Sequence, residues 1–230
     1  MIIGNGLIAS GLKSIDDMFP EVLFFASGVS NSKENNEFNY KREERLLLES
    51  INNNKGKLIV YFSTYSVNDS ERKYESYTLH KIKMEGVVKN NSNYVIFRLT
   101  NVVGYNGNKA NLFNFLINNI SSGKDVTVWK NANRNIVDIE DLSLVVKKIL
   151  KTNVKNITIL LAHPYSYSIS ELIIYISNYF KIQPKLLNSD KGSLYDFKTE
   201  SIVKEAFLET VKNNKEYYIG SLLQKYYPLK

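Results

Sequence analysis

The sequence predicts an α/β protein with a doubly wound parallel sheet covered by helices on both faces. Two observations lead to this prediction. Short apolar runs of strand length alternate with longer segments whose apolar residues recur at helical spacing. A glycine-containing turn, Gly4-Asn5-Gly6, also stands between the first apolar run and the first helical segment. Ligand sites in such sheets lie at the carboxyl ends of the strands, so we expect the functional residues there.

The individual elements follow from the same patterns. The predicted strands cover residues 1–3, 22–26, 58–62, 94–99, 126–129 and 157–161. The predicted helices cover residues 7–18, 40–51, a segment ending at 88, 110–120, 139–150, 172–180 and 201–212. Ser168-Ile169-Ser170-Glu171 fits a capping box at the start of one of these helices.

Composition argues against several kinds of site. The 230-residue chain has no cysteine, which excludes disulfides, thiolate metal sites and a cysteine nucleophile. Its two histidines, His80 and His163, argue against a zinc site, so no metal is expected. The net charge of +7 favours acidic partners such as nucleotides. The lysines are scattered among acidic residues, which favours a solvated surface over a nucleic-acid-binding stripe.

The chain shows no sign of a membrane segment or a signal peptide. No stretch reaches transmembrane length without charge. The first apolar run lacks the preceding basic region of a signal peptide. We therefore expect a cytoplasmic protein without membrane contact.

Gly4, Gly6 and Ala9 form the pattern Gly-x-Gly-x-x-Ala between a strand and a helix. The first glycine allows a tight turn, the second lets the backbone approach a pyrophosphate, and Ala9 permits close packing of helix on sheet. The helix N-terminus would attract the phosphates. A plain strand-to-helix turn produces such a triplet about as often as a cofactor site does.

Tyr77 and Lys81 read Tyr-x-x-x-Lys in a predicted helix, and Thr64 ends an apolar strand upstream. Residues four apart lie on one helix face, so the ammonium can sit beside the phenol. A nearby positive charge favours the phenolate form, and such a tyrosine can exchange a proton with a carbinol or carbonyl oxygen. The Thr64 hydroxyl can hold the same oxygen. Hydride chemistry between a nicotinamide and an alcohol needs these groups. The alternative interpretation is that Tyr77 and Lys81 lie at the solvent-exposed start of a helix and have no catalytic role.

The order of these motifs resembles the extended short-chain dehydrogenase/reductases, the family of sugar-nucleotide epimerases, dehydratases and reductases. The resemblance covers most of the chain. Phe24-Phe25-Ala26-Ser27-Gly28 is similar to the strand whose small residues pass beneath the cofactor. The segment from Phe62 to Val67 resembles the one that carries the catalytic hydroxyl, which implies this role for Thr64. Tyr77 and Lys81 match the catalytic pair.

Two later segments extend the resemblance. The segment from Arg98 to Gly104 is similar to Arg-x-x-Asn-x-x-Gly, which implies that Asn101 contacts the substrate. The segment from Arg134 to Asp141 resembles one whose basic residue faces the nucleotide diphosphate, and a planar guanidinium suits bidentate phosphate contact. Glu85 stands where the family often has an acid.

The resemblance also implies a truncated Rossmann-like sheet. The family has five strands up to and including the Ser/Thr strand, whereas this chain has three. In the order 3-2-1-4-5-6, the missing second and third strands lie at one edge and would carry the acid that binds the adenosine ribose. An alternative parsing takes residues 22–26 as the second strand, with Ser27 or Ser30 at a 2′-phosphate, and the sheet is still short. We expect a dinucleotide-binding core over 1–125. A mixed region over 126–230 would supply late sheet elements and a substrate-binding subdomain.

The implied function is an NAD(P)-dependent reductase or epimerase. It would act on a keto or hydroxyl carbon of a nucleotide-linked hexose, in surface-polysaccharide or deoxysugar biosynthesis. Tyr77 would be the general acid/base, Lys81 would tune it and hold the nicotinamide ribose, and Thr64 would orient the substrate oxygen. NAD or NADP would lie against a set of small residues and the catalytic pair: Gly4, Gly6, Ala9, Ala26, Ser27, Gly28, Tyr77 and Lys81. Asn101 and Arg134 would bind the substrate.

The truncation leaves alternatives open. The chain could bind a dinucleotide weakly with its adenine exposed, bind a nucleotide sugar alone, or share the site with a partner such as the second copy in a homodimer. A rival interpretation is an altered or inactive family member that acts as a nucleotide-sugar-binding or regulatory module. A third is a non-redox lyase or isomerase that uses the same tyrosine and lysine.

Five further residues receive structural interpretations. We expect His80 to be a surface histidine on another helix face and Arg98 to form a surface ion pair. Asp141 should cap or orient the following helix, Trp129 should pack, and His163 should lie in a loop without an active role.

Overall fold

The computed structural model describes residues 1–91, 93–105, 107, 111–208 and 214–229. It forms two compact units, one of residues 1–99 and 142–161 and the other of residues 100–141 and 162–230. The predicted boundary at residue 125 falls inside the second unit, and the division of function between the two halves of the chain stays a prediction. Ala110 and Lys212, the predicted ends of two helices, lie outside the described residues.

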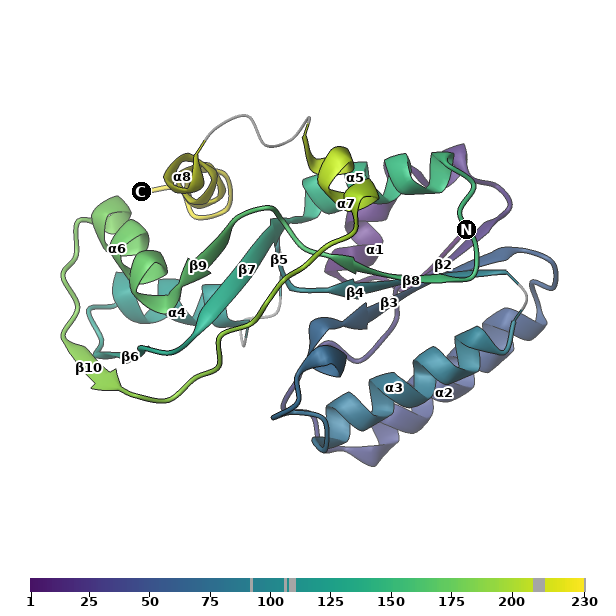
Figure 1. Cartoon of the computed structure of the whole chain (residues 1–230), viewed down its shortest axis with the longest axis horizontal. Helices are drawn as coiled ribbons and strands as arrows, with labels where there is room; N and C mark the ends of the chain where they lie inside the picture. The colour runs from purple at the N-terminus through teal and green to yellow at the C-terminus, as the bar shows by residue number, and fades with distance from the viewer. Residues whose placement is uncertain (92, 106, 108–110, 209–213, 230) are drawn as a thin grey trace. The chain divides into compact units, whose positions relative to one another are not determined.

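A five-stranded parallel sheet forms the centre of the first unit, in the order β1-β2-β3-β4-β8. Figure 1 labels four of its strands, β2, β3, β4 and β8. Its strands are β1 (Ile2–Ile3), β2 (Val22–Phe25), β3 (Leu58–Thr64), β4 (Tyr94–Leu99) and β8 (Ile157–Leu161). All four residues of β2 and most of β3 and β4 are buried. Continuous apolar strands of this kind fit a parallel sheet covered on both faces. The predicted α/β class and doubly wound arrangement are therefore confirmed.

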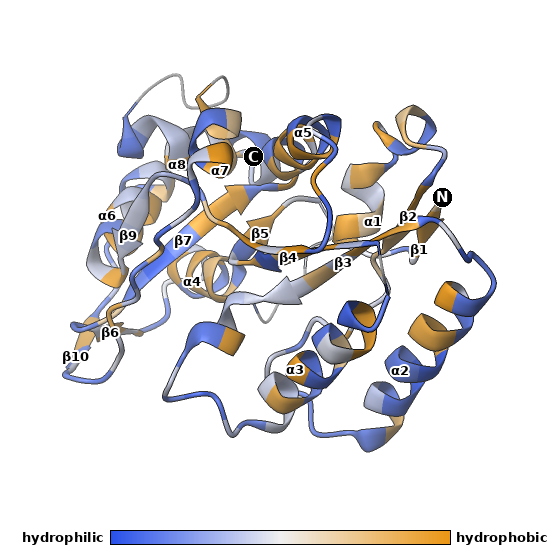
Figure 2. Cartoon of the chain, turned by 45° about the vertical axis from the view of Figure 1, so that its right-hand side comes forward, coloured by the Kyte–Doolittle hydropathy of each residue, from blue (hydrophilic) through white to orange (hydrophobic). Residues whose placement is uncertain are grey.

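Helices cover the two faces of this sheet. Helices α2 (Glu37–Asn52) and α3 (Ser76–Lys89) lie on one face, and α1 (Leu7–Leu12) and α5 (Ile139–Lys151) on the other (Figure 1). Figure 2 shows hydrophobic residues concentrated in β2 and β4 and alternating with hydrophilic ones along α2 and α3. The helix predicted over 7–18 ends early, and the 3₁₀ turn η1 (Asp16–Met18) follows it. Ser10, Gly11 and Ser14 weaken helix propensity in this stretch.

Strand β1 forms one edge of the sheet. Among the described residues it pairs only with β2, with Ile2 opposite Phe24 and Ile3 opposite Phe25. In the full doubly wound order, the first strand has further strands on its outer side. The sheet therefore has the shortened edge that the sequence predicts.

In the part of the second unit that the structure describes, there are two small sheets and four helices. One sheet joins β5 (Asn101–Val103), β7 (Asn133–Asp138) and β9 (Ser166–Ser168), and the other pairs β6 (Val126–Trp129) with β10 (Leu186–Ser189). The helices are α4 (Leu112–Ser121), α6 (Ile169–Phe180), α7 (Ser201–Phe207) and α8 (Lys215–Tyr226). The apolar sides of α4, α6 and α8 form one core with residues of β6 and β7.

Two sequence expectations about this unit have opposite outcomes. The capping box of α6 is confirmed, since Ser168 Oγ accepts from Glu171 N at 3.1 Å and Glu171 Oε2 accepts from Ser168 N at 2.7 Å. The packing role of Trp129 is wrong. Its side chain is 43% exposed because alternate residues of β6 face outward.

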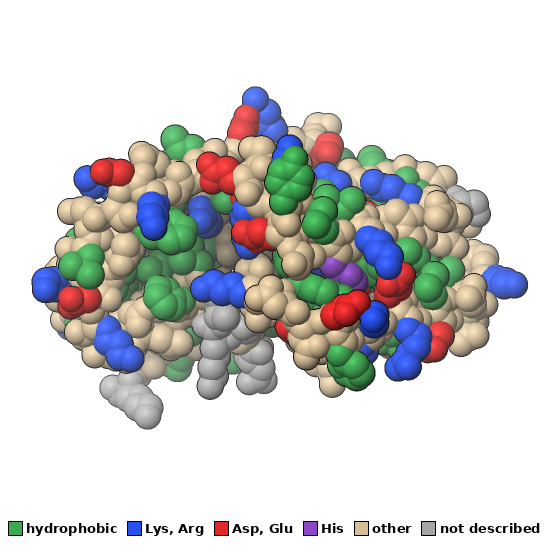
Figure 3. Space-filling model, turned by 90° about the horizontal axis from the view of Figure 1, so that it is seen from below, with side chains coloured by type: hydrophobic (Ala, Val, Ile, Leu, Met, Phe, Trp, Pro, Cys, Tyr) green, Lys and Arg blue, Asp and Glu red, His purple; other side chains and the backbone are tan. Residues whose placement is uncertain are grey.

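The face of the molecule drawn in Figure 3 carries mixed charge. On this face, Lys and Arg side chains are interspersed with Asp and Glu. None of the helices in the described ranges is both long and apolar enough to cross a membrane.

Candidate functional site

The turn after β1 touches the end of β2. Gly4 has a φ of +129°, and a Cβ at this position would lie 2.4 Å from the carbonyl oxygen of Ala26. Only glycine fits such a conformation at such a distance. Gly6 caps α1 with an ordinary φ of −79°, and a Cβ there would meet nothing within 4 Å. The first glycine is therefore required by the fold, and open space lies beside the second.

The loop after β2 lies directly over Lys81. A Cβ on Gly28 would be 2.6 Å from Lys81 Nζ and 3.0 Å from Glu43 Oε1. The neighbouring Ser27 is held by the Arg42 guanidinium, which donates to Ser27 O at 2.9 Å and to Ser27 Oγ at 3.2 Å. The small residues predicted to pass beneath a cofactor thus meet the predicted catalytic lysine.

Helix α3 presents Tyr77, Lys81 and Glu85 on one face, because they stand four residues apart. Tyr77 is 7% exposed and Lys81 only 2%. Lys81 Nζ lies 5.9 Å from the centroid of the Tyr77 ring. The predicted proximity of ammonium and phenol is present, and the alternative of a solvent-exposed helix start is wrong.

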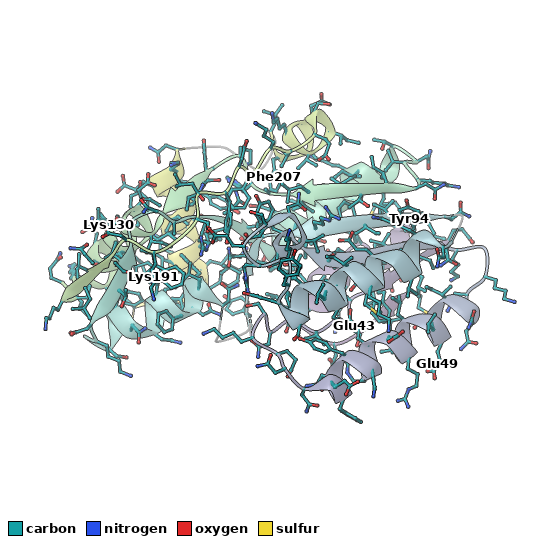
Figure 4. The ribbon with its side chains drawn as sticks, turned by 60° about the horizontal axis from the view of Figure 1, so that its bottom comes forward. Glu43, Glu49, Tyr94, Lys130, Lys191 and Phe207 are labelled. Atoms are coloured by element: carbon teal, nitrogen blue, oxygen red, sulfur yellow. The ribbon has the colours of Figure 1, made fainter. Side chains whose placement is uncertain are left out.

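Glu43 of α2 is the principal partner of Lys81, and sequence reasoning missed it. Its side chain is 0% exposed. Oε1 accepts from Lys81 Nζ at 2.9 Å and from Tyr61 OH at 2.7 Å, and Oε2 accepts from Val29 N at 2.6 Å and lies 3.0 Å from His80 Nε2. Burial alone would raise the pKa of Glu43, but the Lys81 ammonium and these hydrogen bonds lower it to about 2. The carboxylate is therefore charged. Figure 4 shows Glu43 and Glu49 on α2.

His80 is part of the same cluster, so its interpretation as a surface histidine is wrong. It is buried, bonded to Glu43, and stacked on Tyr40 at 4.5 Å between ring centroids. The physical reason is helical spacing: His80 stands three residues after Tyr77, and residues three apart are neighbours on one face. The sequence held a similar signal for Glu43, which stands four residues before the buried Leu47.

Glu85 is a second buried carboxylate on the inner face of α3. It accepts from Ser63 Oγ at 2.7 Å and from Arg98 Nε and Nη2 at 2.9 and 2.7 Å. Burial raises its pKa, but the Arg98 and Ser63 hydrogen bonds outweigh burial and hold the pKa below its usual range. The predicted ion pair of Arg98 is confirmed, although its acidic partner is buried rather than on the surface.

Thr64 stands at the end of β3, where α3 packs against both β3 and η2 (Tyr65–Asn68). Its Oγ1 accepts from Ser66 N at 3.2 Å and donates to Ser66 Oγ at 3.2 Å. The hydroxyl therefore caps the 3₁₀ turn η2. Its role toward a substrate stays a prediction.

The two predicted substrate-binding residues belong to the second unit. Asn101 Nδ2 donates to Asn135 O at 3.1 Å. The Arg134 guanidinium lies 5.0 Å from the centroid of the Tyr195 ring and donates to Asn133 O at 2.7 Å. Their relation to Tyr77 and Lys81 stays a prediction.

Asp141 and His163 also lie in the second unit. Asp138, not Asp141, caps the start of α5, because Asp138 Oδ1 accepts from Glu140 N at 2.9 Å. Asp141 instead accepts from Tyr218 OH at 2.9 Å, and burial raises its pKa to about 6. His163 is stacked on the same Tyr218 at 3.9 Å, and burial lowers its pKa to about 4.

Residues 14–162 match the model of the NAD dependent epimerase/dehydratase family. This span is well over half of the chain and runs from before β2 to the end of β8. The chain belongs to this family. No curated protein matches this chain in sequence.

Solved structures share the fold of this family member. A UDP-N-acetylglucosamine 4-epimerase from Methanobrevibacter ruminantium, in complex with UDP-N-acetylmuramic acid, is 19% identical with a TM-score of 0.68, covering 98% of this chain and 81% of its own. A dTDP-4-dehydrorhamnose reductase from Clostridium acetobutylicum is 18% identical with a TM-score of 0.68, and the match covers 94% of this chain and 85% of the reductase chain. A UDP-glucuronic acid 4-epimerase from Bacillus cereus, in complex with UDP-glucuronic acid and NAD, is 18% identical with a TM-score of 0.62. The match covers 92% of this chain and 78% of the epimerase chain. At these identities the likeness establishes the fold.

Proposed function

We propose that the chain is an NAD(P)-dependent reductase or epimerase that acts on the keto or hydroxyl carbon of a nucleotide-linked hexose. Tyr77 would exchange the proton at the sugar oxygen, Thr64 would orient that oxygen, and Lys81 would favour the phenolate and hold a ribose hydroxyl. Asn101 and Arg134 would bind the substrate. Such an activity would serve surface-polysaccharide or deoxysugar biosynthesis.

The observation that carries this proposal is the convergence of three separate motifs. The turn at Gly4 contacts Ala26 at the end of β2, and Gly28 in the following loop contacts Lys81, which shares a helix face with Tyr77. These residues lie far apart in the sequence but close together at the carboxyl edge of the sheet, where doubly wound folds bind their ligands. Family membership and the nucleotide-sugar ligands of the solved relatives support the same function.

The residues present fit one half of a dinucleotide better than the other. Open space beside Gly6 suits a pyrophosphate, and the small residues Ala26, Ser27 and Gly28 suit the nicotinamide half. The adenosine half has no counterpart, since β1 has no outer neighbour among the described strands. A bound nicotinamide would accept or donate the hydride, while the chain's own groups would position the sugar and move the proton.

One observation favours a second function. The Lys81 ammonium is buried and already bonded to Glu43 and Tyr61, as a structural lysine would be. With the shortened sheet edge, this contact favours an altered family member that binds a nucleotide sugar or regulates a partner without turnover.

Replacing Tyr77 with phenylalanine separates the two functions. We expect Tyr77→Phe to abolish turnover of UDP- and dTDP-hexoses with NAD(P) or its reduced form, while the circular dichroism spectrum stays unchanged. Tyr74→Phe is the matched control, since Tyr74 is exposed and lies just before α3. Equal turnover in wild type and Tyr77→Phe would remove Tyr77 from the chemistry. Ligand binding without turnover in the wild type would favour the second function.

A further inference from the structure

Glu43 has no part in the chemistry proposed above, although it is the main partner of Lys81. Its two oxygens are engaged by four groups, from α3, β3 and the loop after β2: Lys81, His80, Tyr61 and Val29. Because these groups belong to three separate segments and the carboxylate is fully buried, its position is fixed.

Stability alone does not account for this charge. Its hydrogen-bond partner Tyr61 belongs to an apolar cluster that also includes Leu47 of α2 and Met84 of α3. Apolar residues of similar volume in place of a buried ion pair often leave stability unchanged or raise it. A Glu43–Lys81 pair in this layer is therefore better explained by what it does to the lysine.

The pair and Tyr61 form a closed triangle of hydrogen bonds. Lys81 Nζ donates to Glu43 Oε1 at 2.9 Å and to Tyr61 OH at 3.2 Å, and Tyr61 OH donates to the same Oε1 at 2.7 Å. An ammonium has three N–H donors. Two of them are occupied by described residues. A Cβ on Gly28 would lie 2.6 Å from the nitrogen, so the glycine leaves space beside the ammonium that any other residue would fill.

We propose that Glu43 is a positioning residue for Lys81. Together with Tyr61 it holds the ammonium beneath Gly28 and beside Tyr77, and it leaves the third N–H for a ligand hydroxyl at the end of β2. This inference rests on the proposed function for the identity of that ligand, a nicotinamide ribose. The hold of Glu43 on Lys81 can be tested without any ligand.

The amide of Glu43→Gln has one acceptor oxygen and no charge, so it cannot satisfy the groups that the carboxylate now satisfies. The ammonium would then leave its place. Misplacing a catalytic group by about 1 Å costs about 100-fold in rate. We expect a loss of this order in kcat and weaker binding of the dinucleotide.

The direct test is NMR of the lysine ammonium groups in the free, full-length protein labelled with ¹⁵N-lysine, with Lys81→Met to assign the signal. We expect a Lys81 signal protected from water exchange in the wild type and in Glu49→Gln, whose side chain on the same helix is 59% exposed. Glu43→Gln should lose that protection. An unchanged Lys81 signal in Glu43→Gln would overturn the proposal.

Binding of NADH supplies the second arm. Glu43→Gln should raise the dissociation constant for NADH at least about tenfold. It should have no further effect in a Lys81→Met background, because residues that act through one another are not additive. Additive losses would contradict a role through Lys81. If the wild type bound neither NADH nor NADPH, the proposed function would fail, while the NMR arm would still decide whether Glu43 holds Lys81.

A second variant keeps the test open if Glu43→Gln fails to fold. Gly28→Ala adds a methyl group 2.6 Å from Lys81 Nζ and 3.0 Å from Glu43 Oε1, and it removes no hydrogen-bonding group. Because Nζ is the end of a flexible chain, the lysine can yield at little cost to the fold. We expect the Lys81 signal to shift and NADH affinity to fall. A Gly28→Ala protein with wild-type signal and affinity would contradict the positioning.

Discussion

Replacing Glu43 with glutamine should destabilise the first unit strongly at neutral pH. The fold lowers the pKa of Glu43 from 4.5 to about 2. At about 1.4 kcal/mol per pKa unit, the charged carboxylate contributes about 3 kcal/mol. Removal of one member of a buried ion pair costs a similar 3–5 kcal/mol, roughly, because the other charge stays buried without its partner. We therefore expect Glu43→Gln to lose about 3 kcal/mol of unfolding free energy.

The pH dependence follows from the direction of the shift. A group whose pKa is lowered by folding contributes fully above its unfolded value and loses its contribution as the pH falls toward the folded value. The difference between wild type and Glu43→Gln should therefore be largest above pH 4.5 and shrink toward pH 2.

Urea unfolding followed by far-ultraviolet circular dichroism measures this difference. Fluorescence would report mainly on the second unit, because the single tryptophan, Trp129, lies there. Glu49→Gln is the control and should change stability by less than about 0.5 kcal/mol. A loss below about 1 kcal/mol for Glu43→Gln at neutral pH, or a loss that stays constant to pH 2, would refute the assignment of a charged, buried Glu43.

Three further substitutions test the architecture of the site. Gly4→Ala should lower the free energy of unfolding by about 2 kcal/mol or more, since it places a Cβ at positive φ and against Ala26 O. Gly6→Ala should change the free energy of unfolding by less than about 0.5 kcal/mol. Equal melting temperatures for the two variants would contradict the geometry of the turn. Arg98→Met should lower the free energy of unfolding by about 2 kcal/mol at neutral pH, measured by urea unfolding, because it removes the nearer cation of the buried Glu85 and leaves the Lys89 ammonium at 3.5 Å. The pKa of Glu85 is lowered by folding, so this cost should fade as the pH drops below 4.5; a cost that grows in acid would contradict the pairing.

The sequence predicted the first unit well because its signals are local. The strands at residues 94–99 and 157–161 appear as predicted, since each is a short apolar run between polar residues. The shortened edge beside β1 followed from the small interval between Gly6 and Val22, which leaves room for one short helix only.

The second unit was harder to predict from sequence. Strands β5 and β9 have three residues each, and β7 begins with the polar run Asn133-Arg134-Asn135. Their pairing depends on partners far along the chain, such as Asn101 opposite Ile136. Segments this short and polar carry no period from which a strand could be inferred.

In the candidate site, too, local contacts could be predicted from the sequence and contacts between distant segments could not. Tyr77 and Lys81 could be found from their spacing, because a helix brings residues four apart together whatever surrounds it. Glu43 could not be assigned as their partner, since its contact with Lys81 joins two helices across 38 positions. Its place in the charged run Lys41-Arg42-Glu43-Glu44-Arg45 also favoured a solvated helix start.

Equilibrium binding of NADH and NADPH to the wild-type chain tests the central claim most directly. If the motifs at Gly4, Gly28 and Lys81 form one nicotinamide site, fluorescence titration should show saturable binding of at least one of the two, with a dissociation constant below about 1 mM. Absence of saturable binding of either nucleotide up to about 10 mM would contradict the account.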